Sequence, residues 1–386
     1  MKRLGCWVTV MVMLLALVPA KADAVELELD GKSAVLMEVS TGTVLYEKNG
    51  REALPPASVT KVMTMLLIME AIDSGKIGWE DMVTASEAAA AKGGSQIYLK
   101  AGETTSVSDL LKSIAVSSAN DAACAMAEHL AGSEAAFVEQ MNRRAEELGM
   151  EDTHFVNCTG LDDSPEAAEH KTSAYDIALM SRELLKNHPD IKKFTTIWMD
   201  TIRDGQFGLS NTNKLIRFYS GATGLKTGFT AGAMYCLSAS ARREDMELIA
   251  VVMGCQTSKT RATACKSMLD YGFANYALIA PRLEDAVTVP VELGKEKQAA
   301  VMPGNARDLL IEKGLRNAVT TEVTLEETVP APVSRGQRLG TMTVRAGERV
   351  LAQIPLVAVK GVEKLTFSDL FLQILRRAAM AKPADQ

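Results

Sequence analysis

Hydrophobic and polar positions first outline a hairpin and a helix near the start of the chain. Two runs of β-forming residues, at 33–39 and 43–47, flank a turn at 40–42 and predict a β-hairpin. The next apolar run begins at Ser58 and continues to Ala71, and it is hydrophobic on nearly every side. A helix of this kind is typical of a protein core. The pattern therefore predicts a central helix for the first domain.

The following segment predicts a helical cluster and then strands. Helical periodicity recurs at 107–116, 122–131, 133–148 and 173–187. The later runs predict strands at 234–241 and 247–254, and a closing helix at 260–276. Strands first, helices next and strands again favour an antiparallel sheet with a helical cluster on it. The predicted fold class is therefore α+β.

The pattern changes near Pro281, where we expect a domain boundary. The first domain is predicted at 25–280, and residues 281–360 contain short β-like runs separated by turn residues. Those runs lie at 286–291, 319–325, 340–344 and 352–359. Short strands of this spacing are typical of a small all-β domain. This second domain has no cluster of titratable residues with catalytic character, which favours a spacer or a binding module.

The two ends of the chain differ from both domains. Residues 1–24 combine a basic start, an apolar run and a small-residue cleavage site, and they predict a secretory signal peptide. Residues 361–386 contain apolar residues at three- and four-residue steps, followed by Arg376 and Arg377. This pattern predicts an amphipathic helix that lies in a membrane interface. A terminal helix docked on its own β domain is the alternative.

Composition and cysteine count exclude several classes of function. A formal charge of −6 and a pI near 5.5 argue against a nucleic-acid-binding protein. Cys6 falls in the predicted signal peptide, and the remaining cysteines are Cys124, Cys158, Cys236, Cys255 and Cys265. An odd number without C-x-x-C spacing argues against a disulfide framework and a zinc site. We expect most of these thiols to be buried.

A candidate nucleophile and base stand at the start of the predicted core helix. Ser58 and Lys61 are separated by a spacing that places both on one helix face. A serine hydroxyl is a weak nucleophile that needs an adjacent base, and an amine whose pKa is lowered by burial can supply it. A helix-capping serine followed by a solvated lysine would give the same pattern. The pair alone is therefore weak evidence for catalysis.

Two further motifs strengthen the catalytic interpretation. Ser58-Val59-Thr60-Lys61 is followed by Ser118-Ala119-Asn120 and then by Lys226-Thr227-Gly228. In this order they match the S-x-x-K, S-x-N and K-T-G set of penicillin-binding proteins and serine β-lactamases. Over nearly all of its mature length, the chain resembles the low-molecular-mass D-alanyl-D-alanine carboxypeptidases, which include sporulation-associated enzymes of Firmicutes. The resemblance implies a transpeptidase-like catalytic domain.

The resemblance implies an acyl-enzyme mechanism. Ser58 attacks the carbonyl between two D-alanines while Lys61 takes its proton, and water later hydrolyses the acyl-enzyme. Ser118 relays the proton to the leaving amine, and Asn120 holds Lys61 and the substrate amide. The oxyanion hole consists of the backbone N–H groups of Ser58 and Phe229. Some relatives have a histidine where this chain has Phe229, so the preferred peptide is expected to differ. No cofactor or metal is implied.

The resemblance also implies a site for the terminal carboxylate of the substrate. Lys226 supplies positive potential, Thr227 contacts the carboxylate, and Gly228 lets the substrate backbone come close. Arg261 occupies the position of a family arginine that binds the same carboxylate. A solvated arginine at a helix start is the alternative for Arg261.

The implied partners are the peptidoglycan stem peptide, β-lactam antibiotics as covalent inhibitors, and a membrane surface contacted by the C-terminal helix. The implied location is the outer face of the cytoplasmic membrane or the cell wall. A carboxypeptidase and an endopeptidase acting on cross-linked peptides are not separable from the sequence.

Two rival functions remain open at this point. A serine β-lactamase would need a glutamate to activate the deacylating water, and Glu166 and Glu169 stand in the loop at 158–170. The class A loop pattern around such a glutamate is not recognisable. A non-catalytic cell-wall-binding protein is the second rival. The four histidines are scattered, which makes a zinc peptidase and a histidine-dependent serine hydrolase poor fits: His129, His154, His170 and His188.

Overall fold

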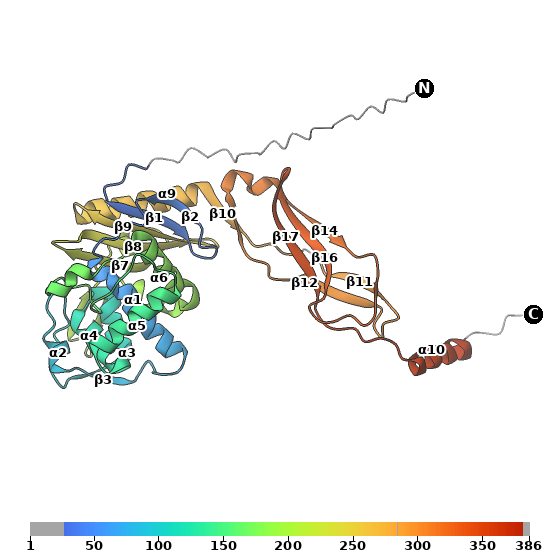
Figure 1. Ribbon diagram of the computed structural model, residues 1–386, viewed down its shortest axis with the longest axis horizontal. Coiled ribbons are helices and arrows are strands. Elements are labelled where there is room, and N and C mark those ends of the chain that lie inside the picture. Colours follow the sequence, from blue (N-terminus) through green and yellow to red (C-terminus); the bar gives the residue numbers. More distant parts are fainter. Residues whose placement is uncertain (1–26, 284, 381–386) are drawn as a thin grey trace, which may run out of the picture.

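The computed structural model describes residues 27–283 and 285–380, with the side chains of Gln373 and 376–380 excepted. The predicted signal peptide at 1–24 lies outside the described residues. The described chain forms two bodies, a sheet-and-helix body and an all-β body, with a helix at the far end of the second (Figure 1).

A five-stranded antiparallel sheet forms the centre of the first body. Its strand order is β2-β1-β9-β8-β7. The strands are β1 (Ser33–Glu38), β2 (Val44–Lys48), β7 (Ala222–Thr230), β8 (Met234–Arg243) and β9 (Met246–Cys255). The first and last parts of the domain therefore share one sheet, as the order of predicted elements indicated. The α+β prediction is confirmed.

Helices cover both faces of this sheet (Figure 1). Helix α9 (Ser258–Asn275) packs on one face, and the other face carries the helical cluster. The cluster contains α1 (Lys61–Asp73), α2 (Glu87–Ala90), α3 (Val107–Ser117), α4 (Asn120–Ala131), α5 (Glu134–Glu147), α6 (Ala174–Asn187) and α7 (Lys192–Thr195). The short helix α8 (Leu215–Phe218) instead packs Leu215 into the core on the α9 face. Helix α1 is buried on almost every side, so the predicted central helix is confirmed.

The start of that helix differs from the prediction. A 3₁₀ turn, η1 (Ala57–Thr60), precedes α1, and Ser58 lies inside this turn. Within the described residues no side-chain hydrogen bond caps either element, so Ser58 is not a helix cap. The other 3₁₀ turns are η2 (Pro165–Glu169), η3 (Pro189–Ile191) and η4 (Lys313–Ala318). Turns of this length leave too little periodicity for a sequence pattern to detect.

Two small antiparallel strand pairs in the first body were not predicted. They pair β3 (Met82–Thr84) with β4 (Thr104–Ser106), and β5 (Met199–Ile202) with β6 (Phe207–Ser210). Their strands are too short to show the alternation that marks a strand in sequence.

The second body is an all-β sheet with the strand order β14-β16-β17-β12-β11-β15. Its strands are β11 (Val287–Glu292), β12 (Gln298–Pro303), β14 (Val319–Leu325), β15 (Val329–Pro330), β16 (Arg338–Ala346) and β17 (Arg349–Ala358). The predicted all-β character is confirmed, although β12 and β15 were not predicted. A separate pair, β10 (Tyr276–Ile279) with β13 (Leu309–Glu312), crosses the boundary predicted at residue 280.

Helix α10 (Phe367–Met380) projects from the all-β body (Figure 1). Its apolar side chains are exposed, including Phe367, Phe371 and Ile374. The residues just before it belong to the β domain, because Val362 pairs with Val333 and the Leu365 N–H donates to Leu293. No helix within 27–283 or 285–380 is both long and apolar enough to cross a membrane.

The cysteines of the described chain are free thiols. Cys124, Cys158, Cys236, Cys255 and Cys265 are all buried, as predicted. Burial raises the pKa of the Cys236 thiol to about 11, so it stays protonated at neutral pH.

Candidate active site

Ser58 lies in a tight turn whose backbone is unusual. The Pro56 carbonyl oxygen accepts the first hydrogen bond of the turn, from the Val59 N–H. The Ser58 N–H comes before this bond, so it is among the donors that a helix start leaves free. Ala57, directly before the serine, has φ of +49°, a left-handed conformation that is uncommon for a residue with a Cβ. Ser58 itself is partly exposed, whereas its neighbours in the turn are buried.

Lys61 is placed to act on Ser58. Its Nζ lies 3.0 Å from Ser58 Oγ and 2.8 Å from the Thr159 carbonyl oxygen. The side chain is completely buried, and this desolvation lowers the pKa of Lys61 to about 7, against the opposing influence of Cys158 and Asp121. The amine is therefore partly neutral at neutral pH and can accept a proton.

The Thr159 carbonyl is oriented by a turn that the sequence analysis missed. Asn157 Oδ1 accepts the N–H groups of Thr159, at 3.1 Å, and Gly160, at 2.6 Å. An asparagine that accepts backbone N–H groups two and three residues later forms a tight turn. The signal in the sequence was Asn157 followed by Gly160 within a loop already rich in turn residues.

Ser118 and Asn120 stand at the junction between α3 and α4. Ser118 is buried and left-handed, with φ of +67°, and it ends α3, while Asn120 begins α4. Asn120 Nδ2 donates to the Gly93 carbonyl at 2.7 Å, and Asn120 Oδ1 is buried without a hydrogen-bond partner among the described residues. The predicted contact between Asn120 and Lys61 is not among the hydrogen bonds of the described residues.

Asp121 is a further residue that the sequence analysis missed. Its carboxylate is completely buried and accepts the N–H groups of Ile97, at 3.1 Å, and Leu99, at 3.0 Å. The Asn120 N–H donates to the Ser95 carbonyl at 2.7 Å. The loop at 93–99 is therefore fixed to the start of α4, beside the second motif. Asp121 followed the motif in the sequence, but no periodicity indicated its partners.

The third motif lies on β7, an edge strand of the sheet. Lys226 is almost completely buried, and its Nζ donates to the Thr227 carbonyl at 3.0 Å. Thr227 Oγ1 donates to Thr212 Oγ1 at 2.7 Å. Desolvation, together with the charges of Lys61 and Arg261, lowers the pKa of Lys226 well below its ordinary value. An incoming anion would offset this repulsion.

Gly228 brings β7 against the Ser58 turn. A Cβ at this position would lie 2.6 Å from the Pro56 carbonyl oxygen and 3.1 Å from the Val59 backbone nitrogen. The missing side chain therefore allows the strand and the turn to touch. This contact brings Phe229 close to the Ser58 turn, since Phe229 is the next residue along β7.

Arg261 anchors to the same end of β7. Its Nη1 donates to the carbonyl oxygens of Gly228, at 2.8 Å, and Cys236, at 3.2 Å. The guanidinium also lies over the Tyr235 ring, which packs against the exposed Phe229 ring at 4.4 Å between centroids. The first motif, the third motif and Arg261 are therefore linked through β7 and the Ser58 turn.

The sequence matches two families of known proteins. Residues 19–257 match the family described as D-alanyl-D-alanine carboxypeptidase, peptidase S11. Residues 282–364 match the C-terminal domain of penicillin-binding protein 5. The chain belongs to the peptidase S11 family. It is therefore a D-alanyl-D-alanine carboxypeptidase.

Relatives of this carboxypeptidase match between 64% and 95% of this chain. D-alanyl-D-alanine carboxypeptidase DacF of Bacillus subtilis (strain 168) is 45% identical over 95% of this chain and 96% of its own. The structure of penicillin binding protein 5 from Haemophilus influenzae matches with a TM-score of 0.74 and 30% identity, over 88% of this chain and 99% of that chain. Penicillin-Binding Protein D2 from Listeria monocytogenes, in its ampicillin-bound form, matches with a TM-score of 0.59 and 32% identity, over 64% of this chain and 99% of that chain.

The glutamates of the β-lactamase alternative do not face the lysine in this carboxypeptidase. Glu166 and Glu169 are exposed on η2, and Lys61 contacts the Thr159 carbonyl instead. The nearby His170 is buried, and its ring contacts Thr60 rather than Ser58.

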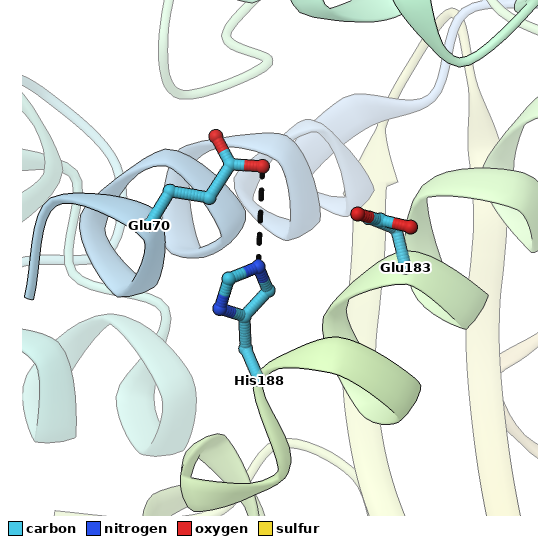
Figure 2. A group of neighbouring side chains, drawn as sticks. All are labelled: Glu70, Glu183 and His188. Atoms are coloured by element: carbon cyan, nitrogen blue, oxygen red, sulfur yellow. Dashed lines mark ion pairs between the residues drawn. The ribbon is translucent and has the colours of Figure 1, made fainter. Parts of the chain in front are cut away.

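One cluster away from Ser58 has the residue types of a metal site. Glu70, Glu183 and His188 bring their ligand atoms within 4.8 Å of one another, from α1 and from the end of α6 (Figure 2). Arg144 of α5 already donates to both carboxylates, at 2.7 Å from Glu70 and 2.8 Å from Glu183. A metal ion would have to displace this guanidinium. The cluster is therefore an ion-pair network that joins three helices.

The substitution Gly160→Ala tests how closely the loop that contains Gly160 must approach the Ser58 turn. A Cβ at Gly160, where φ is +79°, would lie 1.9 Å from the Ala57 carbonyl oxygen. Gly102 has φ of +80° and nothing within 4 Å of its Cβ position. We expect Gly160→Ala to lower the free energy of unfolding by roughly 3 kcal/mol, since overlap adds to backbone strain. Gly102→Ala adds only the backbone strain, so we expect it to lower the free energy of unfolding by roughly 1 kcal/mol. Urea unfolding of both variants measures the difference, and equal losses would contradict the close approach.

Proposed function

We propose that this carboxypeptidase removes the terminal D-alanine from peptidoglycan stem pentapeptides through an acyl-enzyme on Ser58. The observation that carries the proposal is the pairing of Ser58 with a buried lysine. Lys61 Nζ is 3.0 Å from Ser58 Oγ, and burial lowers its pKa to about 7. A base with a pKa near the working pH is the most effective general base.

In the first step, the neutral Lys61 amine takes the Ser58 proton as Oγ forms a bond to the carbonyl carbon between the two D-alanines. Negative charge then develops on the carbonyl oxygen. The backbone N–H groups of Ser58 and Phe229 stabilise it as hydrogen-bond donors. Their proximity through Gly228 supports this role.

In the second step, the bond between the carbonyl carbon and the amide nitrogen breaks. The proton held by Lys61 passes through the Ser118 hydroxyl to the leaving amine, and D-alanine departs. Asn120 Oδ1 accepts an N–H of the substrate, a role supported by this buried oxygen having no hydrogen-bond partner in the part of the chain that the structure describes. Water then hydrolyses the ester on Ser58, with Lys61 again taking a proton.

The terminal carboxylate binds at Lys226, Thr227 and Arg261. The charges of Lys61 and Arg261 both lower the pKa of Lys226, so an anion bound beside Lys226 relieves this repulsion. β-Lactam antibiotics carry a carboxylate beside a reactive amide, so they acylate Ser58 at the same site.

We further propose that the enzyme is exported and acts at the outer face of the cytoplasmic membrane or in the cell wall. The exposed apolar side chains of α10 favour a helix that lies on a membrane surface. The all-β domain between this helix and Ser58 then acts as a spacer that holds the active site away from the membrane.

Ser58→Ala should abolish both D-alanine release from a pentapeptide and the covalent adduct with benzylpenicillin. Loss of a serine nucleophile costs at least about 10⁴-fold in rate. Intact-mass spectrometry with peptide mapping and a D-alanine assay measure the two effects. Ser74→Ala, at the exposed end of α1, is the matched control and should retain both activities. Retained release in Ser58→Ala would refute the proposed mechanism.

A time course of the benzylpenicillin adduct, followed by intact-mass spectrometry, separates this function from its rivals. A persistent adduct on Ser58 together with D-alanine release supports the carboxypeptidase mechanism. An adduct that vanishes within seconds points to β-lactamase behaviour, and a folded protein without an adduct points to a binding protein.

The acylation rate should depend on pH through Lys61. Only the neutral amine accepts a proton, so the second-order rate constant for benzylpenicillin should rise with pH and level off above about 7. Below that pH, we expect a fall of about tenfold per unit. Stopped-flow measurements between about pH 5 and 9, which bracket the pKa of Lys61, test this expectation. A rate independent of pH across this range would exclude Lys61 as the titrating base.

Membrane association should depend on the apolar face of α10. Truncation after residue 366 should abolish binding to vesicles that contain phosphatidylglycerol, while it leaves D-alanine release in solution intact. Phe371→Glu with Ile374→Glu should have the same effect, because charge on the apolar face opposes insertion. Ser368→Glu, which adds an exposed charge to the same helix, is the control. Vesicle flotation measures binding, and unchanged flotation of the truncated protein would rule out the anchor.

A further inference from the structure

The peptide between Ala57 and Ser58 is under conformational constraint. Ala57 is left-handed, with φ of +49°, and is almost completely buried. In a planar trans peptide, the carbonyl group and the N–H group point in opposite directions. The contacts of the Ala57 carbonyl oxygen therefore set the direction of the Ser58 N–H, which is the proposed oxyanion donor.

The Ala57 carbonyl is held by Thr60. The Thr60 hydroxyl donates to it at 2.8 Å, and the same hydroxyl oxygen lies 2.7 Å from His170 Nε2. A hydroxyl has one hydrogen, and here the Ala57 carbonyl accepts it. The Thr60 oxygen must therefore accept a hydrogen bond from His170 Nε2.

The other nitrogen of the His170 ring agrees with this assignment. His170 Nδ1 accepts the Val156 N–H at 3.1 Å, so the proton of a neutral ring must be on Nε2. Burial, together with the charges of His154 and Lys61, lowers the pKa of His170 to about 4. The ring is therefore neutral at neutral pH. The hydrogen bonds then all run in one direction, from the Val156 N–H to His170, from His170 to Thr60, and from Thr60 to the Ala57 carbonyl.

We propose that Thr60 and His170 are positioning residues, which aim the Ser58 N–H at the oxyanion through a hydrogen-bonded chain that ends on the Ala57 carbonyl. The inference rests on the proposed role of Ser58 as the nucleophile. Both residues are buried, at 0% and 3% exposed, and both act on the reaction through the Ala57 peptide.

The residues around this hydrogen-bonded chain shield it from water. The backbone of Gly160 covers the Ala57 carbonyl so closely that a Cβ there would also lie 2.7 Å from Thr60 Oγ1. The Phe155 ring meets the His170 ring edge to face, with 5.6 Å between centroids. Since water has little access to these groups, a lost hydrogen bond is not readily replaced.

Helix α1 offers a matched control for Thr60. Thr64, one turn later, is equally buried, and its hydroxyl donates to the Cys158 carbonyl at 2.7 Å. Thr60→Val and Thr64→Val each replace a buried hydroxyl by a methyl group in the same region. A purely structural role would make their effects alike, whereas a positioning role affects catalysis only at Thr60.

The experiment measures acylation of the full-length mature protein by benzylpenicillin, with the noncovalent affinity and the acylation rate constant determined separately by stopped flow. We expect Thr60→Val to lower the rate constant by about 10–100-fold, because an oxyanion donor acts in the transition state. The noncovalent affinity should stay within about threefold of the wild type. Thr60→Ser, which keeps the hydroxyl, and Thr64→Val should keep the rate constant within the same limits.

A second pair of variants tests the histidine independently, and it decides the question if Thr60→Val fails to fold. His170→Gln can still present an N–H to Thr60, whereas the shorter side chain in His170→Asn cannot. We expect the acylation rate constant to fall about tenfold in His170→Asn and to be largely restored in His170→Gln. His154→Asn, at an exposed histidine in the same segment, should match the wild type.

The outcomes separate this inference from the proposed function. If the wild type carries its adduct on Ser58 and Thr60→Val acylates as fast as Thr64→Val, the positioning role is refuted and the nucleophile stands. Equal rate constants in His170→Asn and His170→Gln refute it as well. If the wild type forms no adduct on Ser58, the proposed function fails first and the inference falls with it.

Discussion

The burial of one lysine amine is the constraint on which the rest of the site depends. An exposed lysine is protonated at neutral pH and cannot take a proton from a serine. Lys61 is different because α1 runs through the core and carries the amine out of water. Its hydrogen-bond partners within residues 27–283 and 285–380 are Ser58 and the Thr159 carbonyl. Burial thus lowers the pKa of the amine and points the amine at the nucleophile in a single arrangement.

That arrangement requires segments far apart in sequence to approach closely, and the backbone is adapted where they meet. Ala57 and Ser118 are both left-handed, although neither is a glycine. Such conformations persist only where surrounding contacts stabilise them. Gly160 and Gly228 lie on either side of the Ser58 turn, and a side chain at either would overlap its backbone. The turn is therefore held between a loop and a strand, and its geometry does not depend on the serine itself.

The sequence was informative where one element carries the signal. The all-round apolar pattern predicted the core helix that buries Lys61, and the three motifs named residues that the structure brings to one region. Contacts between elements could not be predicted in the same way. Nothing in the sequence near Asp121 or His170 indicated its partners, because these depend on how the chain folds. Likewise, Gly228 was expected to make room for substrate, and the structure shows that it also makes room for the turn. The role of each site residue in the reaction stays a prediction.

Electrostatics explain why the site is prepared for an anion. Lys61 and Arg261 both lower the pKa of Lys226, in addition to the larger effect of burial. Clustered cations in a poorly solvated site repel one another, and the only internal relief is loss of a proton. A substrate carboxylate supplies a better partner, so its binding favours protonated Lys226. The cationic cluster therefore serves recognition of the carboxylate, while the burial of Lys61 serves activation of the serine.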